Sequence, residues 1–146
     1  VMPEILHLLD QLVVAGAVRY RRTPVRAPAT VPDRPLATPV VRSAAQAQQG
    51  VPVDDKGVAG FVGNAWHDYM ALDVLQRTVL PMLDGRQGEE ELVAALLQET
   101  QAGRLQFLNQ GQPITDAAQL QRSAREQLRA ALQALRHKAL LMVNQE

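Results

Sequence analysis

Side chains that commonly carry catalysis or bind metals are few in this sequence and lie far apart. The three histidines, His7, His67 and His137, have no second histidine or carboxylate at a metal-ligand spacing such as HExxH. The two serines, Ser43 and Ser123, lie outside any GxSxG motif, and the chain has no cysteine that could act as a nucleophile. We therefore predict no catalytic and no metal-binding residues in this chain.

Two further groups of residues could suggest a site. Glu89, Glu90 and Glu91 could form an acid/base pair or a metal shelf, but three carboxylates better suit the positive end of a helix dipole. The segment 57–63 has the spacing GxxGxxG, yet it lacks the lysine of a phosphate-binding loop and no helix obviously follows it. We interpret the first group as a helix start and the second as a loop, and we predict no cofactor site.

The centre of the chain predicts a strand followed by two helices. Residues 66–72 alternate large apolar with polar side chains, as in a half-buried strand. Asp73 is a suitable N-cap for the first helix, and Pro81 should kink or tighten its last turn. Asp84-Gly85 predicts a turn in which Gly85 takes a left-handed conformation. The second helix begins at the glutamates and is broken by Gly103, which completes a helix-turn-helix unit.

The flanking residues complete a mainly α (α+β) fold with a winged-helix-like domain. We expect a helix at 3–17, a strand at 18–22, a Pro-rich linker at 23–39, a helix at 40–49, a loop at 51–63, a hairpin at 104–115, a helix at 116–138 and a short strand or helix end at 140–143. We then expect residues 1–39 to be the tail of a preceding domain and residues 40–146 to form the winged-helix-like domain. The start at Val1, close to a helix, suggests a piece of a longer protein.

Composition narrows the classes of partner. The formal net charge of the 146 residues is +0, which argues against a general nucleic-acid binder. No apolar run is long enough to cross a membrane, no signal peptide is visible, and the lack of cysteine fits the cytoplasm. Six arginines between Arg19 and Arg42 face one acidic residue, Asp33, so this stretch is either a solvated basic linker or a patch for an acidic peptide or nucleic acid.

Trp66 is the only tryptophan, and two interpretations of its ring stay open. It could anchor the small sheet in the core, or it could be an exposed platform for a partner. The helix-turn-helix also suggests DNA binding as a possible function. Its second helix, however, begins with glutamates where a recognition helix normally meets base edges. The more basic C-terminal helix is the alternative DNA reader.

The order of several motifs resembles a known family. Residues 64–73 (NAWHDYMALD), 80–85 (LPMLDG) and 91–93 (ELV) resemble the C-terminal part of bacterial class I methyltransferases with a methyltransferase regulatory domain, similar to the protein-lysine methyltransferases known from rickettsiae. Upstream, Arg34-Pro35-Leu36-Ala37 and Val41-Arg42-Ser43-Ala44 resemble the linker of that family, so the similarity spans about Leu6 to Leu141. Where the family has Thr-Arg-Asp, this chain has Arg86-Gln87-Gly88, so the second helix loses an aspartate cap.

The resemblance implies a non-catalytic domain that regulates the enzyme or recruits its substrate. S-adenosylmethionine would bind a separate upstream domain, and the partners would be the catalytic domain of the same chain and a protein substrate, with a homodimer through exposed apolar surface as a further expectation. The candidate interaction residues are Asn64, Trp66, His67, Tyr69 and Arg42. The alternatives are a winged-helix module that binds peptides by strand addition and a winged-helix DNA-binding domain.

Overall fold

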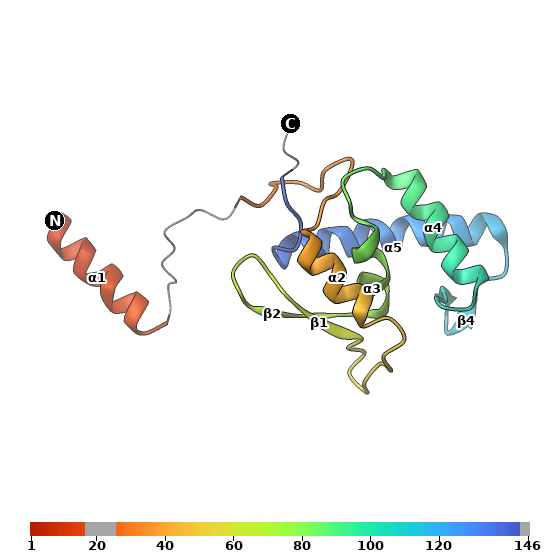
Figure 1. Ribbon diagram of the computed structural model, residues 1–146, viewed down its shortest axis with the longest axis horizontal. Helices are drawn as coiled ribbons and strands as arrows, with labels where there is room; N and C mark the ends of the chain where they lie inside the picture. Colours follow the sequence, from red (N-terminus) through yellow and green to blue (C-terminus); the bar gives the residue numbers. More distant parts are fainter. Residues whose placement is uncertain (17–25, 144–146) are drawn as a thin grey trace.

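A computed structural model describes residues 1–16 and 26–143 (Figure 1). Its elements are α1 (Met2–Val14), α2 (Pro39–Ala47), β1 (Gly60–Gly63), β2 (Tyr69–Leu72), α3 (Val74–Val79), the short 3-10 helix η1 (Leu80–Met82), α4 (Glu89–Gln101), β3 (Leu108–Asn109), β4 (Gln112–Pro113) and α5 (Ala117–His137). The predicted mainly α fold with short sheets is confirmed. The strand expected at 18–22 lies outside the described residues.

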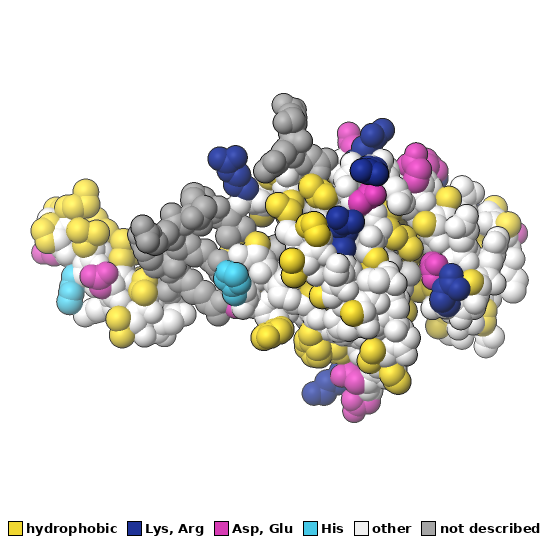
Figure 2. All heavy atoms as spheres, viewed as in Figure 1, with side chains coloured by type: hydrophobic (Ala, Val, Ile, Leu, Met, Phe, Trp, Pro, Cys, Tyr) yellow, Lys and Arg dark blue, Asp and Glu magenta, His cyan; other side chains and the backbone are white. Residues whose placement is uncertain are grey.

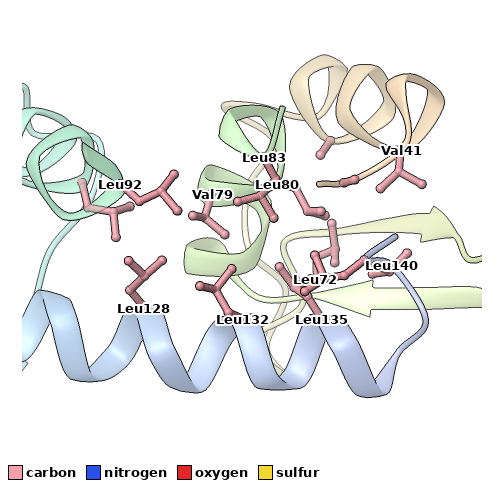
Figure 3. Close-up of a cluster of buried hydrophobic side chains, with 14 of the residues drawn as sticks. Val41, Leu72, Val79, Leu80, Leu83, Leu92, Leu128, Leu132, Leu135 and Leu140 are labelled. Atoms are coloured by element: carbon pink, nitrogen blue, oxygen red, sulfur yellow. The ribbon is translucent and has the colours of Figure 1, made fainter. Parts of the chain in front are cut away.

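The core forms where α5 crosses under the helix-turn-helix unit. Leu128, Leu132 and Leu135 recur at helical spacing on α5 and point toward Val79, Leu80 and Leu92 (Figure 3). Leu72 of β2 and Leu140 after α5 extend the same cluster. Each leucine removed from water contributes about 1.5–3 kcal/mol, so this seam supplies much of the driving force for folding.

The helix starts and turns predicted from local sequence are confirmed. Asp73 Oδ1 accepts a hydrogen bond from Gln76 N (2.7 Å), and Asp116 Oδ2 accepts one from Gln119 N (2.8 Å). Pro81 lies in η1, so the end of the first helix is tightened as expected. Gly85 has a φ of 79°, which is the left-handed conformation predicted for the turn.

The start of α4 compensates for the missing aspartate cap. Gly88 occupies the N-cap position in an extended conformation, and its N–H donates to Glu91 Oε2 (3.0 Å). The reciprocal half of a capping box is absent because glycine has no side chain. The glutamates therefore form a helix start, as the sequence indicated.

The prediction that 51–63 is a loop is wrong at its C-terminal end. Residues 60–63 form β1, which pairs antiparallel with β2 in the register Gly60↔Leu72 to Gly63↔Tyr69. A side chain at Gly60 would collide with the carboxamide of Gln48, so this glycine permits close packing against α2. The hairpin predicted at 104–115 is confirmed as β3–β4, although each of its strands has two residues.

The Pro-rich segment contacts the winged-helix region from about residue 29 onward, where Arg136 Nη1 donates to Ala29 O (3.0 Å). Leu36 forms β-bridges with Asp84 and Met142, and Ala37 N donates to Leu83 O (2.9 Å). Met142, in the short strand or helix end expected at 140–143, donates its N–H to Leu36 O (2.8 Å). These contacts tie the end of the Pro-rich segment to the winged-helix-like domain. The division of the chain into two domains at residue 39 stays a prediction.

Helix α1 differs from the other long helices because none of its residues is buried. It ends at Val14, earlier than the expected residue 17, and Gly16 follows with a φ of 72°. In Figure 1 it stands apart from the winged-helix region. Among the described residues, no helix combines the length and apolar character needed to cross a bilayer.

Candidate interaction surface

The turn between β1 and β2 is organised by Asn64. Its Oδ1 accepts hydrogen bonds from Trp66 N (2.8 Å) and Asp68 N (2.9 Å), and its Nδ2 donates to Lys138 O (3.0 Å). Asn64 is only 6% exposed. This predicted interaction residue therefore uses its side chain inside the domain, where it joins the turn to the end of α5.

Trp66 and His67 lie in this turn and not in a strand. The strand predicted for 66–72 begins only at Tyr69, because the Asn64 carboxamide bends the preceding backbone into the turn. His67 has a φ of 59°, a left-handed conformation uncommon for a residue with a side chain. Trp66 is 40% exposed and is not part of the buried core, so it does not anchor the sheet there, and its role as a platform for a partner stays a prediction.

Two aromatic side chains occupy the outer face of the β1–β2 ribbon. Tyr69 is 84% exposed and Phe61 is 55% exposed, whereas Val62 and Leu72 point to the core. Because Gly63 pairs with Tyr69 and Phe61 pairs with Ala71, Phe61 and Tyr69 are diagonal neighbours on one face. We call Phe61, Trp66 and Tyr69 the aromatic ribbon surface.

Both edges of this ribbon are closed by side chains. Gln48 accepts from Phe61 N (2.8 Å) and donates to Phe61 O (2.8 Å), so its carboxamide takes the place of a neighbouring strand. On the other edge, Lys138 Nζ donates to Ala71 O (2.6 Å) and to Gln76 Oε1 (2.7 Å). Partial burial lowers the pKa of Lys138. The backbone groups of Phe61 and Ala71 at these edges are therefore not free for strand addition.

Arg42 is the predicted site residue that is not linked to the hairpin turn. It is half-buried on α2, and its buried Nε has no hydrogen-bond partner among the described residues. Asn64, Trp66, His67 and Tyr69, in contrast, all lie in or beside the β1–β2 turn. The interaction role of these five residues stays a prediction.

The glutamates of α4 pair with arginines of α5. Arg129 forms two hydrogen bonds to Glu89 (2.6 and 2.7 Å), and Arg125 forms two to Glu90 (2.7 and 2.8 Å). The hydrogen bonds from Arg129 lower the pKa of Glu89 below its ordinary value of 4.5, and the charge of Arg125 adds to this effect. These pairs neutralise two of the arginines that made α5 the alternative DNA reader.

A cavity of about 440 Å³ lies between the Pro-rich segment, the start of α4 and α5. Its apolar walls include Pro32, Leu92 and Leu132, and its polar residues include Asp33 and the paired Glu89 and Arg129. In residues 1–16 and 26–143, no three His, Asp or Glu side chains are grouped to hold a metal ion. The cavity is therefore lined by both apolar and charged side chains, and we assign no catalytic role to them.

The glycine-rich segment 57–63 does not fit a cofactor-binding turn. Such a turn joins a parallel strand to the start of a helix, where free N–H groups point at phosphate. Here Gly60 and Gly63 belong to an antiparallel hairpin, and the Phe61 N–H between them is taken by Gln48. No chemical step is therefore assigned to this segment.

Sequence reasoning missed Phe61 and Gln48, although both define the ribbon. The sequence predicts a loop at Phe61, because the segment 51–63 contains three glycines. The adjacent Phe61 and Val62 show no alternation of apolar and polar side chains in the sequence, so only the structure reveals that one faces out and the other faces in. The pairing with Gln48, 13 positions earlier, has no local sequence signature.

Comparisons with known proteins agree with this architecture. The model of the family "PKMT, C-terminal winged helix domain" matches residues 33–140. The solved structure of PKMT2 from Rickettsia typhi is similar with a TM-score of 0.76 and 20% identity, over 98% of this chain and 28% of that one.

The same relative in complex with AdoHcy is similar with a TM-score of 0.72 and 20% identity, over 97% of this chain and 27% of that one. No curated protein matches. At this identity the solved structures show the fold alone, and this chain spans little more than a quarter of their length. The family match covers most of the chain, and the chain therefore belongs to the family of the PKMT C-terminal winged-helix domain.

Proposed function

We propose that this chain is the non-catalytic C-terminal domain of an S-adenosylmethionine-dependent protein-lysine methyltransferase, in which it recruits the protein substrate or regulates the enzyme. The observation that carries the proposal is the family match over residues 33–140. The exposed aromatic ribbon surface supports a role in contacts, because exposed aromatic side chains are common anchors of protein interfaces. The catalytic domain of the same chain and a protein substrate are the proposed partners.

S-adenosylmethionine is assigned to another domain of the longer protein. The solved relative binds AdoHcy, and this chain corresponds to 27% of that relative's length. Residues 60–63 of the glycine-rich segment form a strand of an antiparallel hairpin, which is not the strand-to-helix turn of a nucleotide-binding site. We further propose a bacterial, cytoplasmic enzyme, which agrees with the bacterial relative and with the lack of cysteine.

Two observations favour this function over the alternatives. Peptide capture by strand addition needs an open sheet edge, but Gln48 and Lys138 occupy the edges of the ribbon. DNA binding needs free cations, but Glu89 and Glu90 pair with Arg129 and Arg125. We therefore do not propose nucleic acid as a partner.

The test uses the parent protein with and without this domain. One form is the full chain, and the other ends before residue 26 of this numbering. We expect both forms to bind S-adenosylmethionine, whereas only the full chain methylates its protein substrate at the normal rate. Equal protein methylation by both forms would refute the proposal, as would a parent protein that lacks a class I methyltransferase domain.

A further inference from the structure

Helix α1 is amphipathic but has no partner for its apolar face. Met2, Ile5, Leu6, Leu9, Leu12 and Val13 recur at spacings of three and four residues, so they share one side of the helix. None is buried, and Leu9 in the middle of the face is 44% exposed. Hydrophobic side chains are visible on the surface of α1, at the left of Figure 2. A helix of this length is marginal alone in water, where about 12–15 residues are needed, so a covering partner would stabilise it.

The charges of α1 indicate a protein as that partner. The polar side carries Glu4, His7, Asp10 and Gln11, and the helix contains no lysine or arginine. Helices that lie on membrane surfaces usually carry many basic residues on the polar face, because phospholipid headgroups are anionic. An acidic helix with an apolar face instead suits the groove of a folded protein.

The aromatic ribbon surface is the second uncovered apolar feature. Phe61, Trp66 and Tyr69 all project from one hairpin and are exposed. In Figure 1 the β1–β2 turn points toward the side of the winged-helix region on which α1 lies. The apolar face of α1 and the aromatic ribbon surface can therefore contact the same folded protein beside the winged-helix region.

We infer that the preceding part of the parent methyltransferase chain covers both surfaces, so that α1 and the aromatic ribbon surface both pack against it. This inference rests on the proposed function. The solved relative supplies the argument for the occupant: it superposes on 98% of this chain, so α1 is included, and the match uses only 28% of its own length. More than two thirds of such a chain is then available to fill the two surfaces.

The test compares side-chain exposure in the full parent chain and in this chain alone. The 26–143 region has its own buried core, so the isolated chain is a valid reference. Hydroxyl-radical footprinting with mass spectrometry measures the oxidation rates of Met2, Trp66 and Tyr69. We expect these rates to fall several-fold in the parent protein.

Substitutions identify the surfaces. In the parent chain, Leu9→Asp and Tyr69→Asp should each restore rapid oxidation at its own surface. Gln11→Asp, on the polar side of α1, and Leu108→Asp, at an exposed apolar position of β3, should leave the rates low. Both test positions are exposed, so the domain itself stays folded.

The outcomes separate this inference from the proposed function. Unchanged oxidation of either surface in the parent chain would overturn the inference, and so would protection that appears only at high protein concentration, because that would indicate a second copy as the occupant. If both surfaces stay exposed while removal of the domain abolishes protein methylation, the proposed function stands and the inference fails. Protection in a parent without methyltransferase activity would refute the function alone.

Discussion

Asn64 joins two parts of the chain that are 74 positions apart, through its hydrogen bond to Lys138 O. Asn64→Ala removes this bond and the two acceptor contacts within the turn. Because the backbone groups that lose their partners are partly buried, we expect the free energy of unfolding to fall by about 1–3 kcal/mol. Urea unfolding followed by Trp66 fluorescence measures the change.

Tyr69→Ser is the control for the same hairpin. The Tyr69 side chain is almost fully exposed, so its loss should change the free energy of unfolding by less than about 0.5 kcal/mol. An equal loss in both variants would show that the hairpin depends on its strand residues and not on the carboxamide of Asn64. The sequence suggests both Asn64 and Tyr69 as contact residues. A motif does not reveal that the side chain of Asn64 bonds to the end of a distant helix.

At the scale of elements, the carboxamide of Gln48 replaces a missing strand beside β1. Gln48→Ala removes its bonds to Phe61 N and Phe61 O and opens the edge of the ribbon. We expect a loss of about 0.5–1.5 kcal/mol in unfolding free energy and faster aggregation, because an open edge can pair with another chain. Chemical denaturation and light scattering measure the two effects; Gln46→Ala, an exposed position on α2, should change neither.

The pairing of α4 with α5 makes part of the stability depend on pH. The pKa of Glu89 in the folded protein lies below its ordinary value of 4.5, mainly because Arg129 donates hydrogen bonds to it. The ionised carboxylate therefore stabilises the fold above pH 4.5, and this contribution is lost as the pH falls through the lowered folded pKa.

Glu89→Gln should thus cost up to about 1 kcal/mol at neutral pH and progressively less in acid. Urea unfolding at a series of pH values tests this, with Asp55→Asn in the exposed loop as the control. A cost that stays constant down to acid pH would mean that the glutamate acts through packing and not through its charge.

Local signals predicted the helices well, and contacts between distant segments explain the errors. Asp73 and Asp116 cap helices through bonds to residues three positions away, so the sequence alone places these helix starts. The sequence does not predict β1, because the glycine at position 60 does not reveal its close contact with Gln48 at the end of α2. The sequence also does not decide the exposure of Trp66, since a single tryptophan suits either a core or an interface.

At the scale of the whole molecule, the described residues form a packed winged-helix region and a separate α1. The core cluster takes residues from Ala37 to Leu141, whereas α1 has no buried residue. Removing residues 1–25 should therefore leave the free energy of unfolding unchanged within about 0.5 kcal/mol. Urea unfolding of the shortened chain, with its slope and midpoint, gives the measurement.

A deeper truncation provides the contrast. Removal of residues 1–38 also deletes the Pro35 carbonyl that accepts from Gly85 N, the Leu36 bridges and the bond from Ala37 N to Leu83 O. Several partly buried backbone groups then lose their partners at about 1–3 kcal/mol each, so this form should be strongly destabilised or unfolded. If the first truncation were also to cost more than about 1 kcal/mol, α1 would pack on the winged-helix region itself, and its apolar face would need no outside partner.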